Sequence, residues 1–248
     1  MVVAPRRCRS RPLPLLNLDP DLGAALDREE FEEAGHELRA HVARVPIGPW
    51  QPQIDGGRST LGLLVVGGLL IRETRCGTNC TAELLGARDV IRPWGTGEES
   101  VVESTPSWLV AEEARVALLD DEFAAALGRW PAIGAALLDR ALQRARSLGV
   151  QRTFAQLRRL DERTLLYLFH VGERFGRVTP AGIAIHLPLT HERLASLVGA
   201  HRPSLTSALI GLERDGALIR DGRHDLVLTA RAVDRVAELT DQPSRLAA

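Results

Sequence analysis

The stretch Leu187–Thr229 has the sequence LPLTHERLASLVGAHRPSLTSALIGLERDGALIRDGRHDLVLT, and its spacing predicts two short helices followed by a β-hairpin. Thr190 is a good N-cap for the first helix, and Gly199 is placed to end it. Because proline is tolerated only in the first turn of a helix, Pro203 indicates that the second helix begins near Arg202.

The second predicted helix has one apolar and one polar face. Its inward stripe follows the i, i+3, i+4, i+7 spacing: Leu205, Ala208, Leu209 and Leu212. Its outward face is small and polar, with an arginine at the start: Arg202, Ser204, Thr206 and Ser207. Hydroxyls and an arginine at the start of a helix can reach phosphates and base edges in a major groove. Residues 221–224 are a strong hairpin turn signal. The order of these features predicts a winged helix-turn-helix that binds DNA.

The predicted DNA-contacting residues lie in the two helices and at the tip of the hairpin: Thr190, His191, His201, Arg202, Pro203, Ser204, Thr206, Ser207, Arg223 and His224. The stretch 187–229 holds five arginines and five acidic residues, so its motif favours DNA binding more strongly than its charge does. The bland alternative is a helical hairpin packed inside a larger domain. The glycine turn, the polar second helix and the wing occur together in the expected order, which favours a DNA-binding winged helix-turn-helix over this alternative.

The composition is that of a globular protein. The chain has 248 residues, enough for two modest domains or one large one, with 45% hydrophobic and 25% charged residues. All 31 basic residues are arginine, because the sequence contains no lysine. The net charge of -1 does not exclude nucleic-acid binding, since that needs only a local basic face.

The cysteines and the apolar segments indicate the cytoplasm. Three cysteines, Cys8, Cys76 and Cys80, cannot form a full disulfide framework, which suits a reducing compartment. The N-terminus lacks an apolar core of signal-peptide length, and the longest apolar run, Leu61–Ile71, is too short to span a bilayer. We therefore expect a cytosolic protein without a membrane partner.

The N-terminal half combines a helical segment with a β domain. Residues 1–18 are rich in Arg and Pro and are predicted to be a flexible arm. Asp19 is a plausible N-cap for one or two helices that end near Val42. Short β-leaning segments follow, at residues 42–48, 61–74, 81–86, 89–95, 100–104 and 107–120. They favour a sandwich, jelly roll or barrel, with a turn or bulge at Gly67–Gly68.

From Asp120 to Arg159 the pattern is helical, and Trp130–Pro131 marks a new helix start. An apolar stripe follows: Ile133, Leu137, Leu138, Ala141, Leu142, Ala145 and Leu148. Such a helix can pack on its own sheet or pair with its twin in a dimer, although Gly149 weakens the case for one unbroken coiled coil. A further helix is predicted over Asp161–Phe175, with Gly176 at the stop position.

The segment LTHERLASLVGAHRPSLTSALIGLERDGALI, residues 189–219, resembles the C-terminal domain of the Crp/Fnr transcription regulators. The resemblance implies an α+β fold: an N-terminal jelly-roll (cupin-like) sensor domain of the cyclic-nucleotide-binding type, a long dimerisation helix and a C-terminal winged helix-turn-helix. With the arm at 1–18, the implied domains are residues 19–130, 131–159 and 160–240. The resemblance also implies a homodimer on a near-palindromic operator in double-stranded DNA, with RNA polymerase as a further candidate partner.

Two positions of the second helix depart from the family's pattern. Arg202 falls where the family often has an arginine at the start of the recognition helix. Pro203 stands at a position that is often acidic, and Ser207 at one that is often arginine. The preferred operator should therefore differ from that of the best-known members.

The predicted sensor lacks the family's phosphate-binding residues. Nucleotide-binding members use a Gly-Glu pair and a following arginine, whereas the corresponding segment here, residues 89–94, ends in Pro93 and Trp94. Residues 103–108 contain no arginine, and Arg92 is the one candidate substitute. A buried phosphate without a paired cation is costly. We therefore expect an effector other than a cyclic nucleotide, or none, and no cofactor.

Other functions receive less support from the sequence. Cys76 and Cys80 could supply two metal ligands or a redox disulfide, but two unconnected thiols are the simpler interpretation, and an iron–sulfur cluster normally needs four thiolates. We predict no metal site and no catalytic residue, because no Walker loop, G-x-S-x-G or HExxH motif occurs. The alternatives are a non-catalytic module that binds a protein partner and, more weakly, a metal- or redox-dependent protein that uses Cys76 and Cys80.

Overall fold

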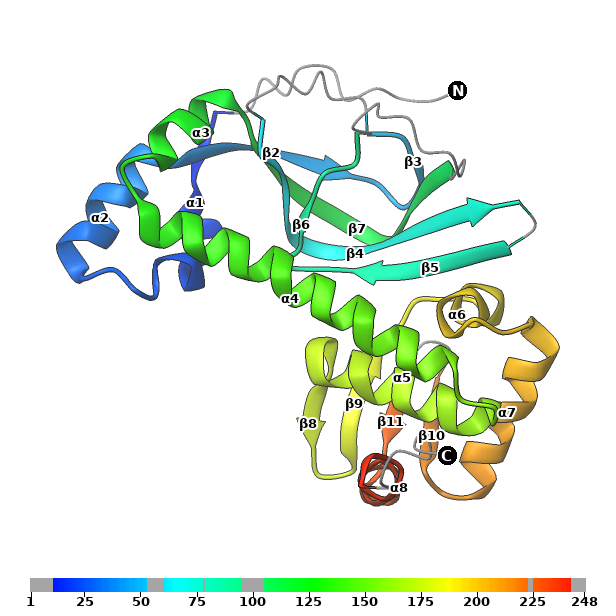
Figure 1. Cartoon of the computed structure of the whole chain (residues 1–248). Helices are drawn as coiled ribbons and strands as arrows, with labels where there is room; N and C mark the ends of the chain where they lie inside the picture. The colour runs from blue at the N-terminus through cyan, green and yellow to red at the C-terminus, as the bar shows by residue number, and fades with distance from the viewer. Residues whose placement is uncertain (1–10, 53–59, 78, 95–104, 223–224, 242–248) are drawn as a thin grey trace, which may run out of the picture. The chain divides into compact units, whose positions relative to one another are not determined.

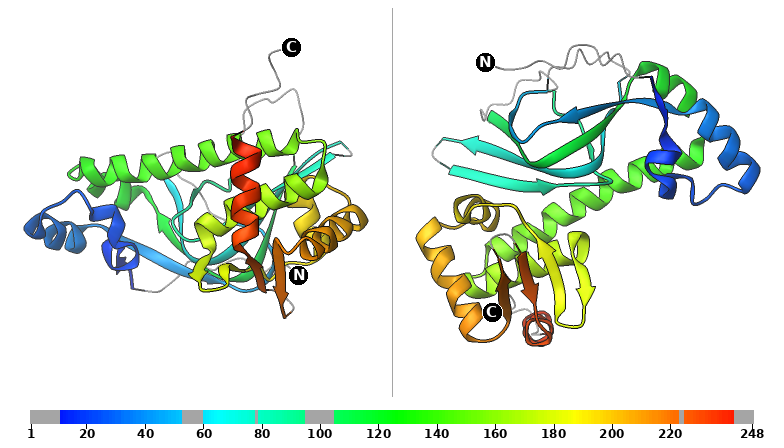
Figure 2. Two further views of the ribbon diagram at one scale, coloured as in Figure 1. Left: turned by 90° about the horizontal axis from the view of Figure 1, so that it is seen from below. Right: turned by 180° about the vertical axis from the view of Figure 1, so that it is seen from behind.

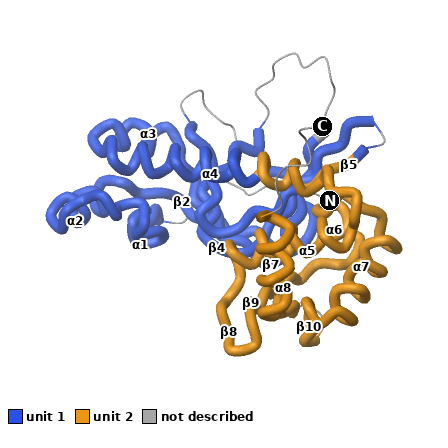
Figure 3. The backbone as a smooth tube through the Cα atoms, turned by 60° about the horizontal axis from the view of Figure 1, so that its bottom comes forward, with its two compact units in different colours: residues 1–79, 83–147 blue, residues 80–82, 148–248 orange. Residues whose placement is uncertain are grey.

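The computed structural model describes residues 11–52, 60–77, 79–94, 105–222 and 225–241. The chain divides into two compact units (Figures 1 and 3). Unit 1 comprises residues 1–79 and 83–147, and unit 2 comprises residues 80–82 and 148–248. Strands dominate unit 1 and helices dominate unit 2, as expected for an α+β protein.

Unit 1 is built on one sheet with two long central strands, β4 (Gly62–Cys76) and β7 (Thr105–Leu119). The other strands are β1 (Leu13–Pro14), β2 (Arg39–Val45), β3 (Gly48–Trp50), β5 (Asn79–Leu85) and β6 (Val90–Ile91). The main order is β1-β2-β7-β4-β5, with β3 paired to β7 and β6 paired to β4. Strands β4 to β7 overlap the β segments predicted from the sequence, whereas β2 begins at Arg39, before its predicted segment 42–48, and β1 was not predicted. The predicted segment 100–104 lies outside the described residues.

The apolar run of β4 is continuous because both faces of the sheet are buried. Leu64 belongs to a core cluster shared with the helices of unit 1, whereas Leu63 and Val65 belong to a second cluster with Trp50 and Trp108. Successive side chains of a strand point to opposite faces. A strand between two cores therefore reads as an uninterrupted hydrophobic run rather than as an alternating one.

The predicted irregularity at Gly67–Gly68 is a β-bulge. The register between β4 and β7 shifts on both sides of Gly67. Gly68 has φ +82°, and a Cβ built there would lie 2.3 Å from the carbonyl oxygen of Glu113. Only glycine fits this backbone conformation and this close approach.

The start of the chain corrects the predicted arm. Residues 1–10 lie outside the described residues, but Leu13–Pro14 form β1, and α1 (Leu15–Leu18) follows directly. Leu15 and Leu16 are 0% and 1% exposed, so this segment is part of the core. The flexible-arm prediction is therefore wrong from Leu13 onward, because apolar leucines between the prolines are buried.

The helical segment after Asp19 is also shorter than predicted. A 3-10 helix, η1 (Pro20–Gly23), precedes α2 (Arg28–Glu37), and the chain enters β2 at Arg39 instead of staying helical to Val42. The cap of α2 is Asp27, which forms a reciprocal capping box with Glu30. The predicted cap, Asp19, makes no capping hydrogen bond.

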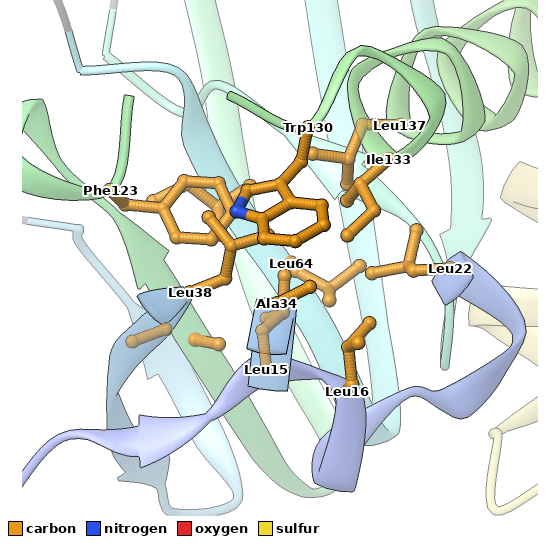
Figure 4. Packing of buried hydrophobic residues seen from close by; sticks show 13 residues of the cluster. Leu15, Leu16, Leu22, Ala34, Leu38, Leu64, Phe123, Trp130, Ile133 and Leu137 are labelled. Carbon is orange, nitrogen blue, oxygen red and sulfur yellow. The ribbon is translucent and has the colours of Figure 1, made fainter. Parts of the chain in front are cut away.

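The helices of unit 1 meet its sheet in one core cluster, shown in Figure 4. Phe123 comes from α3 (Asp121–Leu127), and Trp130 immediately precedes α4 (Pro131–Ala155). Ile133 and Leu137 on α4 belong to the same core cluster as Leu15, Leu16 and Leu22 of the N-terminal segment. The predicted helix start at Trp130–Pro131 is confirmed, whereas α4 ends at Ala155 instead of Arg159.

The predicted stripe of α4 divides between two faces. Ile133 and Leu137 are buried, whereas Leu138 and Leu142 are 61% and 46% exposed. On the buried side, Arg140 makes a bidentate ion pair with Asp19, and its Nη2 lies 2.8 Å from Asp19 Oδ1. Both side chains of this pair are less than 10% exposed.

The described residues of unit 2 form four complete helices, the end of α4 and a small sheet. Its helices are α5 (Leu160–Phe175), α6 (His191–Val198), α7 (Arg202–Arg214) and α8 (Ala230–Thr240). Its strands are β8 (Arg177–Thr179), β9 (Gly182–His186), β10 (Leu218–Asp221) and β11 (Asp225–Leu228), in the order β10-β11-β9-β8. Figure 2 (right) shows the two hairpins side by side. The predicted two-stranded wing is thus part of a larger sheet. No helix in the described part of the chain could cross a membrane.

The buried pair of Asp19 and Arg140 generates a stability prediction. Asp19→Ala leaves the arginine buried without its partner, so we expect the free energy of unfolding to fall by about 3–5 kcal/mol. Replacing both residues, as Asp19→Leu with Arg140→Met, should recover most of that loss, because no unpaired charge remains buried. Denaturant unfolding of the two variants measures the difference.

The exposed pair of Arg28 and Glu32 provides the control for that measurement. Arg28→Ala should change the stability little, because water already solvates both charges. A small effect of Asp19→Ala, similar to that of the control, would contradict the prediction.

Candidate nucleic-acid interface

The helix-turn-helix of unit 2 is defined by local capping and turn residues. Thr190 is the N-cap of α6, and its Oγ1 accepts a hydrogen bond from the Arg193 backbone N–H at 3.3 Å. Gly199 ends α6 in the left-handed conformation, with φ +72°. Helix α7 begins at Arg202, with Pro203 in its first turn. The predicted cap and end of α6 and the predicted start of α7 are therefore confirmed.

The apolar stripes of the two helices are buried, and α7 packs against both α5 and α6. The buried side chains are Leu194, Leu197 and Val198 on α6, and Leu205, Ala208, Leu209 and Leu212 on α7. This burial fixes the rotation of α7 about its own axis. Its polar face must consequently point away from the core.

The outward face of α7 carries an unpaired arginine and small polar groups. Arg202, Pro203, Ser204 and Ser207 are exposed, as is His201 directly before the helix. Arg202 is the only charged residue between positions 202 and 212. Within the described residues its guanidinium group has no carboxylate partner. A free guanidinium at the positive end of a helix is suited to an anionic partner.

Two residues of the predicted contact set bind each other. Thr206 is half-buried, and its Oγ1 lies 3.0 Å from His191 Nδ1, so the start of α6 is tied to α7. The same hydroxyl lies 3.0 Å from the carbonyl oxygen of Arg202. One turn of helix separates these positions, and Ser207 makes the corresponding bond to the carbonyl of Pro203 at 3.2 Å. Only Ser204 among the three predicted hydroxyls has no such bond among the described residues.

The wing is tied to α7 by an ion pair that the sequence did not reveal. Arg220 on β10 makes a bidentate contact with Glu213, with Nη2 2.5 Å from Oε2. This hydrogen bond raises the pKa of Arg220. On β11, Asp225 Oδ1 lies 2.7 Å from His186 Nδ1 on the neighbouring strand. The predicted contacts Arg223 and His224 lie outside the described residues.

A second set of charges joins the outer helices to the turn after α7. Arg235 on α8 lies 3.2 Å from Asp161 on α5 and 3.1 Å from Asp215. Burial would raise the pKa of Asp161, but the hydrogen bonds from Arg159 and Arg235 outweigh it and lower that pKa. Three of the five acids in the stretch 187–229, Glu213, Asp215 and Asp225, are thus engaged inside the domain. They do not lie on the exposed face at the start of α7.

The other candidate residues, Arg92, Cys76 and Cys80, lie in the described part of the β domain. The Arg92 guanidinium lies 5.8 Å from the centre of the Trp94 ring. Of the two segments expected at the phosphate position, residues 89–94 are described, whereas residues 103 and 104 of the segment 103–108 lie outside the described residues. Trp50 and Trp108 pack edge to face at 5.9 Å. Cys76 and Cys80 are exposed free thiols. No group of three or more potential metal ligands occurs among the residues that the structure describes; Cys8 lies outside them.

The helix-turn-helix matches a known family model, described as a Crp-like helix-turn-helix domain, over residues 162–233. Unit 2 contains a Crp-like helix-turn-helix domain. The match includes α5, both hairpins and the start of α8, so the domain is larger than the stretch from which it was first predicted. The predicted resemblance to this domain of the Crp/Fnr regulators is confirmed.

Solved structures share the fold of most of the chain. A mutant of CooA from Carboxydothermus hydrogenoformans has a TM-score of 0.62 at 17% identity, covering 82% of this chain and 88% of that one. FixK2 from Bradyrhizobium japonicum has a TM-score of 0.61 at 18% identity, covering 83% and 99%. A CRP/FNR-family transcriptional regulator from Thermus thermophilus has a TM-score of 0.54 at 20% identity, covering 79% and 98%. No curated protein sequence matches the chain.

At these identities the structural similarity establishes the fold. The predicted succession of a β domain of the cyclic-nucleotide-binding type, a long helix and a winged helix-turn-helix is therefore confirmed. The Crp-like helix-turn-helix is the DNA-binding type of domain in this chain.

The exposed guanidinium of Arg202, at the start of α7, leads to a prediction about DNA binding. Arg202→Ala should weaken binding to a preferred DNA site by about 1–3 kcal/mol, because a base contact is lost. The same variant should relax the sequence preference at one base pair of each half-site. Binding to a set of single-base variants of the site measures both effects.

Arg214 provides a matched control in the last turn of the same helix. It is exposed and has no carboxylate partner among the described residues. Arg214→Ala should lower the affinity for all sequences alike, if at all, because only a phosphate contact could be lost. An equal, sequence-independent loss for Arg202→Ala would contradict a base-reading role.

Proposed function

We propose that the protein is a sequence-specific, DNA-binding transcription regulator of the Crp/Fnr type that acts as a homodimer. The observation that carries this proposal is the Crp-like domain, in which α7, the second helix of the helix-turn-helix, holds on its outward face small polar groups and an arginine without a partner among the described residues. Burial of the opposite stripe leaves this face free for a major groove.

The proposed interface is centred on the start of α7. Arg202 reads a base edge, and Ser204, Ser207, Pro203 and His201 lie against the same groove. Thr190 at the start of α6, together with Arg223 and His224 of the wing, contacts phosphates. The contacts to phosphates set orientation, whereas the contacts to bases set specificity. Since Pro203 stands at a position that is often acidic in the Crp/Fnr regulators and Ser207 at one that is often arginine, the preferred half-site should differ from theirs.

Helix α4 is the proposed dimer contact. Its exposed apolar positions recur every three or four residues: Ala135, Leu138, Leu142, Ala145 and Gly149. Its opposite face is occupied, since Arg140 binds Asp19 and Arg144 binds Glu83. Spacing of this kind suits a second helix running alongside. The small residues Ala145 and Gly149 would allow the two helices to approach closely.

The signal that controls the protein is proposed to be something other than a cyclic nucleotide, or absent. Arg92 is the one arginine of the segment 89–94, and it stacks on Trp94. Arg92 is exposed, so it does not line a buried pocket in which it could pair with a cyclic phosphate. We infer a cytoplasmic location from the proposed action on DNA, with RNA polymerase as a further proposed partner.

Selection of DNA from a random pool by the full-length protein tests the proposed function. The expected result is an enriched, near-palindromic site whose half-sites are about one helical turn apart. The salt concentration must be stated, because phosphate contacts make the affinity depend strongly on it. A folded protein that enriches no sequence would overturn the proposal and favour a module that binds a protein partner.

The exposed stripe of α4 generates a prediction about assembly. Leu138→Glu combined with Leu142→Glu should convert a dimer into monomers, because like charges would be buried at the proposed contact. Sedimentation equilibrium measures the mass. Ile47→Glu is the control, since Ile47 is an exposed apolar residue of unit 1 away from α4. A wild-type monomer, or a double variant that remains dimeric, would exclude this helix as the contact.

A further inference from the structure

A pair of hydrogen bonds connects the start of α6 to the first turn of α7. His191, the first residue of α6, has its Nδ1 atom 3.0 Å from Oγ1 of Thr206 on α7. That Oγ1 is also 3.0 Å from the backbone carbonyl oxygen of Arg202. The hydroxyl group of Thr206 therefore connects His191 on α6 to the backbone of Arg202, the first residue of α7.

The chemistry of the three groups sets the direction of both bonds. A threonine hydroxyl has one hydrogen, and a carbonyl oxygen can only accept. For both bonds to form, Thr206 must donate to the Arg202 carbonyl, and the His191 imidazole must donate from Nδ1 to Thr206. Neutral His191 then carries its proton on Nδ1 and has a lone pair on Nε2.

The other polar groups around His191 already have partners. His191 lines a small cleft of about 40 Å³ together with Arg220 and Asp225 of the wing. Arg220 is held by Glu213, and Asp225 contacts His186. Neither of these two described wing residues therefore competes with Thr206 for the imidazole.

The same turn of α7 is held at a second point. Pro203 has a restricted φ, and its carbonyl oxygen accepts a hydrogen bond from Ser207 Oγ at 3.2 Å. The carbonyls of Arg202 and Pro203 are thus both bonded by side chains one turn further along. Of these two contacts, only the one through Thr206 extends to another helix.

We propose that His191 is a positioning residue for DNA reading: through Thr206 it holds the first turn of α7 and so directs the Arg202 side chain. In this role His191 and Thr206 do not read bases themselves. The inference rests on the proposed function and adds a residue whose contribution to specificity is indirect. Because the first turn of α7 is already held in place, less conformational entropy is lost when Arg202 is ordered on DNA.

Paired substitutions distinguish the two ring nitrogens of His191. In His191→Asn the side-chain amide can stand where Nδ1–H stood, whereas in His191→Gln it reaches the position of Nε2. Thr206→Ser keeps the hydroxyl, and Thr206→Val removes it with little change in shape. Each variant is checked for wild-type folding by circular dichroism and thermal unfolding before its DNA binding is measured.

The readout is affinity for the selected site and for a copy changed at the base pair that Arg202→Ala relaxes. His191→Gln and Thr206→Val should each weaken binding to the selected site by roughly 3- to 10-fold, the value of one hydrogen bond. They should also lower the discrimination between the two sites, which a purely structural role would leave unchanged. His191→Asn and Thr206→Ser should resemble the wild type, and the double variant His191→Gln with Thr206→Val should lose no more than either single variant.

Two other results would overturn the inference while leaving the proposed function intact. Weak binding by His191→Asn with normal binding by His191→Gln would mean that Nε2 contacts DNA directly. Unchanged binding and discrimination in all the variants would mean that the bond to Thr206 has no role in reading DNA.

A spectroscopic test of the same bond needs no DNA. Nitrogen NMR of the DNA-free protein should show the neutral His191 ring protonated at Nδ1, and a ring protonated at Nε2 would overturn the inference whatever the protein binds. If the wild type selects no DNA, the proposed function fails and the positioning role fails with it, even where the expected tautomer is found.

Discussion

The attachment of α4 to the β domain depends on two arginines spaced one turn apart. Arg140 pairs with Asp19, and Arg144 makes a bidentate contact with Glu83, with 2.6 Å between Arg144 Nε and Glu83 Oε1. Residues four apart lie on the same side of a helix, so both pairs face the sheet. Buried charges are tolerated only when they are paired and hydrogen-bonded, which makes this rotation of the helix strongly preferred.

This rotation has a consequence for the rest of the chain. With Arg140 and Arg144 turned inward beside Ile133 and Leu137, the side that carries Leu138 and Leu142 is left exposed. An ordinary amphipathic helix has a single apolar stripe and buries all of it. In this helix, polar anchors occupy part of the inward face and leave a second apolar face available for a partner helix. The dimer that we propose therefore follows from where the charges are buried.

In the Crp-like domain, charged side chains also do structural work that their exposure alone would not suggest. Arg220 binds Glu213 across the junction of α7 and the wing, and Arg235 joins α8 to α5 and to the turn at Asp215. Arginine suits these positions because its planar group makes two parallel hydrogen bonds to a carboxylate. Arg202 stands apart from them as the arginine at the start of α7, without a carboxylate partner among the described residues. The stretch 187–229 therefore has equal numbers of arginines and acidic residues, but they differ in their roles. Several form ion pairs within the domain, whereas Arg202 is available to contact DNA.

Local sequence determined much of the Crp-like domain and most of the strands. The cap at Thr190, the left-handed Gly199 and the proline after Arg202 act within a few residues, and the apolar spacing of α7 sets its buried face without help from elsewhere. Tertiary structure decided the features that depend on distant partners. Asp19 reads as a helix cap, but its partner Arg140 is 121 residues away. Thr206 reads as a DNA contact, but its hydroxyl faces His191 on another helix. Leu15 and Leu16 read as part of an arm, but they fill a core to which α4 contributes. Periodicity and capping report interactions between neighbours in the chain, whereas ion pairs and core contacts between remote segments exist only once the chain has folded.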